Sequence, residues 1–402
     1  MSYNISERIH LEVLGMAYKN VSVIQNAKVV LEGGIIFDGV IVVADGRIAA
    51  VGKRGVVEIP TGAKVIDAKG AYVGPGFVDI HVHGGNGYST CYEPVEASEF
   101  FLEHGSTTIF ATPDYHQNAD EIYEYIKITK ASLDKAKTVR GIYMEAPYTN
   151  PDYGSHSYMN PWRGPVDPKD FVRLVDEAGD LVRVWTIAPE RMSEGLLPFL
   201  EYARKVNPKV AFALGHSEAT PAQIRALGKY RPKIMTHTFN ATGRRGEVAN
   251  RGIRSVGSDE YCLCEPDMYA ELISDSLGIH VKSELQQMLV RAKGVDKVIL
   301  ITDGTPLNNP NPEKYAHVTD LNFDPRGALS GSKMTMEQAC RNVMTHTNCG
   351  IAEAFMMAAG NPARAVGLGD ELGSIEAGKR ADLVFVDDIF NVKEVMLEGE
   401  MV

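Results

Sequence analysis

The sequence predicts an α/β protein in which a (β/α)8 TIM-type barrel is joined to a small β-sandwich domain built from both ends of the chain. Two observations lead to this prediction. Between residues 76 and 369, eight short apolar runs typical of strands alternate with longer amphipathic stretches typical of helices. Before and after that region, the pattern changes to short apolar runs separated by turns, as in a small sheet. At 402 residues, of which 44% are hydrophobic, the chain is long enough for both parts.

We expect three segments along the chain. Residues 1–75 hold a leader and the first part of the β-sandwich, residues 76–369 form the barrel, and residues 370–402 complete the sandwich. The leader, residues 1–20, is polar and weakly helical and contains no motif that indicates a function.

The strands expected for the sandwich lie at both ends of the sequence. In the N-terminal part, the apolar runs 40–43 and 48–51 flank the turn Ala44-Asp45-Gly46, which predicts a hairpin. The runs 381–386 and 392–396 near the C-terminus have the same character. One sheet that combines both ends is therefore expected.

Eight apolar runs are predicted to form the barrel strands. They are residues 77–82, 107–112, 139–145, 182–187, 210–216, 234–237, 277–280 and 298–303. Helix-like stretches such as 119–136 and 221–228 follow them. In this fold the carboxyl ends of the strands carry the chemistry, so the residues that end each run are the candidates for function.

The first barrel strand ends in two histidines, His81 and His83. Residues two apart in an extended chain project to the same side, so both imidazoles could bind one metal ion. Gly84 and Gly85 follow and leave space where another group must approach the strand end. A His-x-His pair in a strand is common without a metal, so this motif needs support from the rest of the chain.

Other predicted strands also end in polar residues that can bind a metal or transfer a proton. They are Glu145, His216, His237, His280 and Asp303. Each alone could be a satisfied core or loop residue. At equivalent positions of one barrel they instead indicate a metal-dependent hydrolytic site, because imidazole and carboxylate suit zinc, iron or a similar divalent ion. Such an ion lowers the pKa of a bound water, and Asp303 could take its proton and pass it to a leaving group.

Composition excludes several other classes of function. A net charge of -11 disfavours nucleic acid and anionic membranes as partners. No apolar run reaches the ~18 residues of a membrane span, and no signal sequence is apparent, so we expect a cytoplasmic protein. The five cysteines are scattered and odd in number, which argues against a disulfide framework. Cys262 and Cys264 are interpreted as a strand or loop pair, with a zinc site as the minor alternative.

The order of motifs resembles the amidohydrolase superfamily and, within it, the N-acetylglucosamine-6-phosphate deacetylase family. The resemblance covers nearly the whole chain after the leader. It rests on the Pro-Gly-Phe-x-Asp-x-His-x-His strand of residues 75–83, Tyr143-Met144-Glu145-Ala146-Pro147, Gly154-Ser155-His156, Ala188-Pro189-Glu190, Gly215-His216-Ser217, Thr236-His237-Thr238-Phe239-Asn240-Ala241, Thr302-Asp303, Leu329-Ser330-Gly331-Ser332, Asn361-Pro362-Ala363 and the tail from Gly373 to Leu383.

The resemblance implies a metal site and a set of catalytic and substrate residues. Glu145, His216 and His237 would bind one divalent ion, and His81 and His83 could complete a second position. Zinc is expected first, with iron, manganese, nickel or cobalt as alternatives and one or two ions per subunit. Asp303 would be the base and acid, and His156 would contact the acetamide. The implied substrate-binding residues are Ser155, Asn240, Ala241, Arg245, His280, Leu329, Ser330 and Gly331. For residues 329–332, the start of an ordinary helix is an equal alternative.

Three positions depart from the family pattern. Ala146 replaces a glycine after Glu145, a small change. Leu277 stands where the pattern Asp-Gly-x-His has a carboxylate, which puts the identity of the sugar in doubt. The family's phosphate-binding arginine, supplied across a homodimer interface, has three candidate counterparts here, Arg244, Arg245 and Arg251.

The function expected from this resemblance is metal-dependent hydrolysis of the acetamide of an N-acetyl amino sugar 6-phosphate, a linear amide C–N bond. N-acetylglucosamine-6-phosphate is the first candidate substrate. The alternatives are an amidohydrolase acting on a related N-acetylhexosamine, an N-acyl amino acid or a cyclic amide, and a non-catalytic scaffold. A scaffold has no need of the metal-binding residues. Cyclic-amide hydrolases of the superfamily commonly place a carboxylated lysine where this chain has Glu145.

Overall fold

The structure is a computed structural model that describes residues 20–114, 116–243 and 255–402. The predicted leader and the three candidate phosphate-binding arginines, Arg244, Arg245 and Arg251, lie outside the described residues. Within them, no helix combines the length and the apolar character that crossing a membrane requires.

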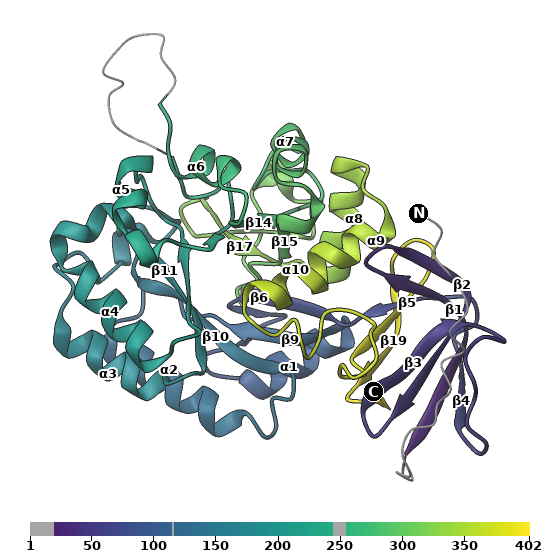
Figure 1. The fold of residues 1–402 in the computed structure, drawn as a ribbon. Helices are drawn as coiled ribbons and strands as arrows, with labels where there is room; N and C mark the ends of the chain where they lie inside the picture. The colour runs from purple at the N-terminus through teal and green to yellow at the C-terminus, as the bar shows by residue number, and fades with distance from the viewer. Residues whose placement is uncertain (1–19, 115, 244–254) are drawn as a thin grey trace.

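Eight parallel strands form a barrel at the centre of the molecule (Figure 1). In sheet order they are β6 (Phe77–Val82), β9 (Ser106–Ala111), β10 (Val139–Tyr148), β11 (Val182–Ile187), β12 (Ala211–Leu214), β13 (Ile234–Met235), β14 (Tyr269–Ile273) and β15 (Val298–Ile301). The ring closes between its last and first strands. There the Asp303 amide donates to the His81 carbonyl at 3.1 Å and the His83 amide donates to the Gly304 carbonyl at 2.8 Å. The prediction of a (β/α)8 barrel is confirmed.

One predicted barrel strand was wrong. The seventh strand is β14, Tyr269–Ile273, whereas residues 277–280 form a turn after it. Gly278 has φ +60°, which an extended strand does not allow, and the Leu277 and Ile279 amides donate to the Asp275 carboxylate at 2.9–3.1 Å. These amides are thereby used locally, so His280 lies in the loop beyond the strand.

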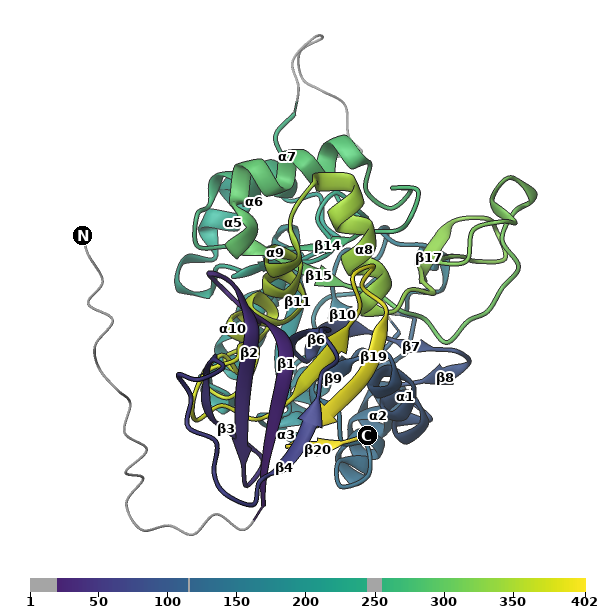
Figure 2. The ribbon, with the colours of Figure 1, turned by 90° about the vertical axis from the view of Figure 1, so that its right-hand side faces the viewer.

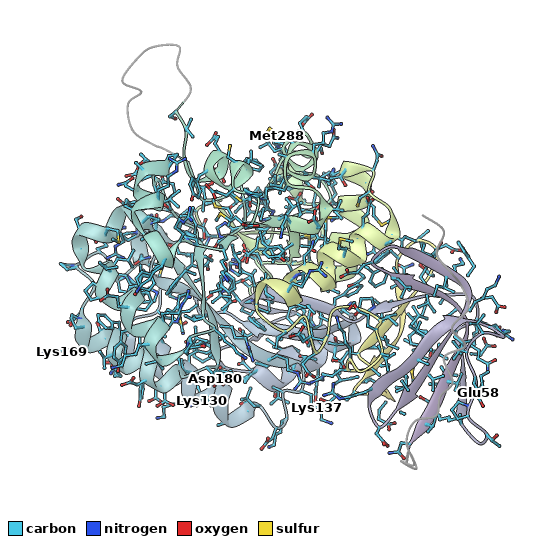
Figure 3. The ribbon with its side chains drawn as sticks, in the orientation of Figure 1. Glu58, Lys130, Lys137, Lys169, Asp180 and Met288 are labelled. Carbon is cyan, nitrogen blue, oxygen red and sulfur yellow. The ribbon has the colours of Figure 1, made fainter. Side chains whose placement is uncertain are left out.

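Helices cover the outside of the barrel. They are α1 (Pro94–Glu103), α2 (Ala119–Ser132), α3 (Pro168–Ala178), α4 (Leu196–Val206), α5 (Pro221–Ala226), α6 (Ser258–Cys264), α7 (Ser283–Lys293), α8 (Met336–Thr347), α9 (Ile351–Phe355) and α10 (Asn361–Ala365). In α3, Asp167 caps the first turn, and Phe171, Leu174, Val175 and Ala178 form one buried stripe at helical spacing. Lys169 near the start of α3 is exposed and lies at the outer edge of the molecule in Figure 3.

A second eight-stranded sheet combines both ends of the chain and is called the composite sheet below. It contains β1 (Val21–Leu31), β2 (Gly34–Ala44), β3 (Arg47–Lys53), β4 (Lys64–Asp67), β5 (Tyr72–Pro75), β18 (Leu383–Val386), β19 (Val392–Leu397) and β20 (Glu400–Met401). The antiparallel pair β5 and β18 joins its N-terminal and C-terminal parts. Figure 2 shows the yellow C-terminal strands beside the purple N-terminal ones.

The composite sheet leads directly into the first barrel strand. Only Gly76 separates β5 from β6, and its amide donates to the Asp382 carbonyl at 2.8 Å. A Cβ atom on Gly76 would lie 2.3 Å from the Thr107 hydroxyl, and one on Gly74 would lie 2.2 Å from the Phe355 ring. The glycines are therefore required where the two parts of the structure approach most closely.

A buried arginine holds the long segment that follows β10. Arg191, in the short 3-10 helix η2 (Pro189–Glu194), donates to the carbonyls of Pro147, Thr149 and Gly164 at 3.3, 3.0 and 2.6 Å. Its Nε also donates to Glu194 at 2.8 Å. These contacts fix both ends of the segment that contains His156.

We expect Arg191→Met to lower the free energy of unfolding by roughly 2–4 kcal/mol, because buried carbonyls lose their donor. Urea denaturation followed by circular dichroism measures the change. The matched control is Arg173→Met, which removes an exposed ion pair to Asp120 at 2.6 Å and should cost less than about 1 kcal/mol. Equal effects of the two variants would contradict the structural role of Arg191.

Candidate active site

Five predicted metal ligands come together at the carboxyl-terminal mouth of the barrel. His81 lies in β6 and His83 directly follows it, Glu145 lies in β10, and His216 and His237 each lie two residues beyond the end of their strands, β12 and β13. They form two overlapping groups, one of His81, His83 and Glu145 and one of Glu145, His216 and His237. Within each group the possible ligand atoms lie within 4.8 Å of one another. Glu145 belongs to both groups.

The second of these groups is the tighter one. Glu145 Oε1 lies 2.8 Å from His216 Nε2 and 3.1 Å from His237 Nε2, and the two imidazole nitrogens are 3.1 Å apart. Two nitrogen lone pairs at this separation require a proton or a cation between them. Two nitrogens and one carboxylate oxygen are also a ligand set that zinc and similar ions accept.

The other group is completed by Asp303, which follows β15. His83 Nε2 lies 3.3 Å from both Glu145 Oε2 and Asp303 Oδ1. His81 Nε2 lies 3.5 Å from Glu145 Oε1 and 3.8 Å from Asp303 Oδ1. This nitrogen is buried and has no hydrogen-bond partner among the described residues. Its direction and its lack of a partner fit a metal ligand.

The electrostatics of the cluster also fit a bound cation. Burial alone would raise the pKa of Glu145, but His81 and His216 hold it well below its usual value. Burial likewise opposes ionisation of Asp303, yet the hydrogen bond to His83 and the nearby histidines lower its pKa. For His83, burial lowers the pKa, but Asp303 and Glu145 raise it to about 10. The ionised carboxylates thus attract positive charge, which protonated histidines or a divalent ion in their place would supply.

Three of these side chains are aimed inward by unusual backbone conformations. The φ angles of His216, His237 and Asp303 are +45°, +26° and +47°, in the left-handed region that non-glycine residues rarely adopt. Each such residue costs on the order of 1–3 kcal/mol, and such strain is typical of functional sites. Each of the three residues lies two residues beyond the end of a barrel strand, where the chain turns toward the axis.

A cavity of about 430 Å³ opens beside the cluster. Its walls include His83, Glu145, His216, His237 and Asp303 together with the predicted substrate residues Ser155, His156, Asn240, Ala241, Leu329, Ser330 and Gly331. Residues 329–332 are β17 (Leu329–Ser332), paired with β16 (Leu321–Phe323), and α8 begins later, at Met336. The alternative that this stretch begins a helix was therefore wrong.

His156 enters the cavity from the segment held by Arg191. Its Nδ1 lies 3.1 Å from the Ser155 hydroxyl, which donates to Ser330 Oγ at 3.1 Å. The imidazole is about half-buried, and this burial lowers its pKa. His156 is therefore neutral near pH 7 and can donate or accept a hydrogen bond.

His280 does not line the cavity. It is buried, with Nδ1 3.0 Å from Asp275 Oδ2 and Nε2 3.2 Å from the Gly331 carbonyl. Its own carbonyl accepts from Asn240 Nδ2 at 3.3 Å. His280 thus supports two segments of the cavity wall from behind.

Leu277 does not line the cavity, and its effect on which sugar is bound stays a prediction. Leu277 is 46% exposed, and Asp275, two residues earlier, supplies the carboxylate that contacts His280. Burial would raise the pKa of Asp275, but hydrogen bonds from His280 and nearby amides lower it to about 2.

Sequence reasoning missed three polar residues of this region. Asp114 and His116, after β9, line the cavity, and Asp114 Oδ1 lies 3.5 Å from His83 Nδ1. They follow a predicted strand, so the rule that found the other ligands also pointed to them. Glu271, in β14, lies 3.2 Å from His81 Nδ1. Its signal was a lone carboxylate within an apolar run.

The sequence matches the amidohydrolase family over residues 72–402. The chain belongs to the amidohydrolase family. Among curated relatives of this family member, N-acetylglucosamine-6-phosphate deacetylase of Bacillus subtilis is 27% identical over 397 residues, which cover 94% of this chain and 96% of the relative. N-acetylgalactosamine-6-phosphate deacetylase of Escherichia coli O157:H7 is 26% identical, with 94% and 98% covered. Among solved structures, N-acetylglucosamine-6-phosphate deacetylase of Mycobacterium smegmatis has a TM-score of 0.77 and 28% identity, with 95% of this chain and 100% of that chain covered.

Removing Glu145 should weaken metal binding by both groups, whereas removing His216 should affect only one. We expect Glu145→Ala and His216→Ala to bind zinc at least about 100-fold more weakly, because each loses a direct ligand. Elemental analysis after dialysis and zinc titration of chelated protein measure this. His104→Ala, which removes a histidine paired with Glu337 at 2.9 Å outside the cluster, is the control. Unchanged metal content in both ligand variants would contradict the assignment.

Proposed function

We propose that this family member hydrolyses the acetamide of an N-acetyl amino sugar 6-phosphate, releasing acetate and the amino sugar phosphate. The observation that carries the proposal is the histidine and carboxylate cluster at the wall of a cavity that also contains Ser155, His156, Asn240 and Ser330. The relatives add support, because their names specify this reaction on the glucosamine and galactosamine series. A Mycobacterium smegmatis relative was solved in complex with N-acetyl-D-glucosamine-6-phosphate.

The second candidate, a different amidohydrolase that acts on a cyclic amide or N-acyl amino acid, is less well supported. The third barrel strand contributes the glutamate Glu145 to the cluster, where cyclic-amide hydrolases of the superfamily commonly have a carboxylated lysine. The curated relatives named above also act on N-acetyl sugar phosphates according to their names.

In the proposed mechanism, Glu145, His216 and His237 would hold the metal, and His81 and His83 could hold a second ion. When bound, it supplies a Lewis acid that polarises the amide carbonyl and makes water acidic enough to attack near neutral pH. Asp303 is ionised, faces the cavity and lies 3.3 Å from His83, so its carboxylate can accept a proton beside the cluster. Asp303 then returns this proton to the leaving amine.

His156 and its neighbours orient the substrate in this proposal. The Ser155 hydroxyl links His156 to Ser330 across the cavity wall, so the imidazole is held in a defined position. A neutral imidazole can hydrogen-bond the acetamide without adding a charge. The backbone of residues 329–331 and the side chain of Asn240 offer polar contacts to sugar hydroxyls.

The proton-transfer role of Asp303 predicts that Asp303→Asn retains the fold and metal yet lowers kcat by a factor on the order of 10² or more, since an amide cannot act as the base. The main-chain bond from Asp303 to His81 does not involve the side chain and is preserved. Acetate release under saturating substrate gives kcat. Asp388→Asn, at an exposed position paired with Lys28, should leave the rate unchanged. A near wild-type rate for Asp303→Asn would exclude it as the base, and His156 would be tested next.

The phosphate requires cationic donors that the described cavity wall does not supply. That wall contains no lysine or arginine among the described residues. We propose that Arg245, or else Arg244 or Arg251, binds the phosphate and is contributed by the second subunit of a homodimer.

We expect kcat/KM for N-acetylhexosamine 6-phosphates to exceed that for the unphosphorylated sugars by about tenfold or more, since a charged hydrogen bond contributes ~1.5–3 kcal/mol. Arg245→Ala should raise KM by a similar factor for the phosphorylated sugar only. The panel should include glucosamine and galactosamine forms, because relatives of both specificities are similar to this chain. Equal kcat/KM values with and without phosphate would remove the phosphate from the proposal and leave a metal-dependent deacylase.

Zinc as the resident ion, the homodimer and a cytoplasmic location remain predictions. Elemental analysis of protein purified without added metal tests the first, and light scattering tests the second.

A further inference from the structure

Glu271 is a buried carboxylate that the proposed mechanism does not use. It lies in β14, and its side chain is completely inaccessible to solvent. Its Oε2 atom lies 3.2 Å from His81 Nδ1 and accepts the backbone amide of His237, also at 3.2 Å. Its Oε1 atom has no hydrogen-bond partner among the described residues. Burying a carboxylate in this way is unfavourable unless cationic or donor groups offset it.

We propose that Glu271 is a positioning residue for the second cation position, the one formed by His81, His83, Glu145 and Asp303. The inference rests on the proposed metal centre. Glu271 contacts His81 on the edge of the ring opposite the cluster, so it would act through His81 and not on the substrate.

The hydrogen bond to Glu271 fixes which nitrogen of His81 is free to bind a cation. Because a carboxylate oxygen accepts a hydrogen bond, the contact with Glu271 engages His81 Nδ1 and leaves Nε2 as the ring nitrogen that faces the cluster. Nε2 is the atom that points at Glu145 and Asp303 and has no hydrogen bond among the described residues. Outer carboxylates of this kind orient metal-binding histidines in many proteins.

The plane of the His81 ring is fixed as well. The ring stacks on Tyr143 with centroids 4.5 Å apart and planes 23° apart. Tyr143 is itself held, because its hydroxyl lies 2.8 Å from Thr236 Oγ1. Tyr143 thus limits tilting of the ring, and Glu271 limits its rotation within that plane.

Glu271 also links the two groups of ligands. It accepts the backbone amide of His237, which belongs to the tighter group, and it contacts the ring of His81, which belongs to the other group. It adds negative charge near both without occupying a coordination position.

The test is zinc titration of chelated full-length protein, comparing wild type with Glu271→Gln and Glu271→Leu. His81→Ala identifies the binding event that depends on His81, and His216→Ala identifies the event that depends on the tighter group. We expect Glu271→Gln to weaken the His81-dependent event about 10-fold and Glu271→Leu about 100-fold. The event lost in His216→Ala should weaken less, because Glu271 reaches the tighter group only through the backbone amide of His237 and not through a ligand side chain.

The matched control is Glu337→Gln, which alters another glutamate bonded to a histidine, His104, at 2.9 Å. It should leave zinc binding unchanged. Thermal unfolding of each chelated variant checks that the fold is retained, and Glu271→Gln, which preserves shape, should unfold close to wild type.

The proposal is overturned if zinc binding by Glu271→Gln and Glu271→Leu equals wild type, if both binding events weaken equally, or if wild type has no His81-dependent event. Because the readout is metal affinity, it does not depend on the substrate. If the acetate-release panel showed no deacetylase activity, the zinc-binding result for Glu271 would still stand. Likewise, an unchanged zinc affinity in the Glu271 variants would leave the deacetylase activity untouched.

Discussion

The shared carboxylate of Glu145 is the interaction on which the centre depends. Four histidines from three strands or their ends approach its two oxygens at 2.8–3.5 Å. Glu145 comes from β10, so the position of one strand determines whether both ligand groups can form. The barrel satisfies this requirement by hydrogen-bonding every strand to two neighbours, including the closing contacts between Asp303 and His81. The strained turns at His216, His237 and Asp303 are tolerated because the ring around them is continuous.

Much of this arrangement could be predicted from sequence because strand ends and chemistry coincide in a parallel barrel. An apolar run that ends in a polar residue predicted both a strand and the ligand at its end. The residues found in this way are His83, Glu145, His216, His237 and Asp303. The position of the seventh strand was predicted wrongly for a physical reason. Glu271 interrupts the apolar pattern of the true strand, whereas residues 277–280 resemble a short strand. The return of Asp275 onto His280 could not be predicted, since it depends on a turn whose amides bind that carboxylate.

The contacts within the cavity wall could not be predicted from the spacing of residues in the sequence. Segments from residues 154–156, 240–241 and 329–331 meet there although they are distant in sequence. Their contacts depend on Arg191 at one side and on His280 at the other, neither of which faces the cavity. Resemblance to a family identified the wall residues, but only the fold explains what holds them in place.

The junction between the composite sheet and the barrel has a consequence for how the chain is made. Strand β5 pairs over two residues with β1 and over four with β18, which lies close to the C-terminus. During synthesis β5 therefore remains largely an unpaired edge until residues 383–386 leave the ribosome. Gly76 alone separates that edge from the strand with His81 and His83. Pairing of that edge thus waits for the synthesis of β18, and a chain cut short before β18 would expose an edge open to misassembly.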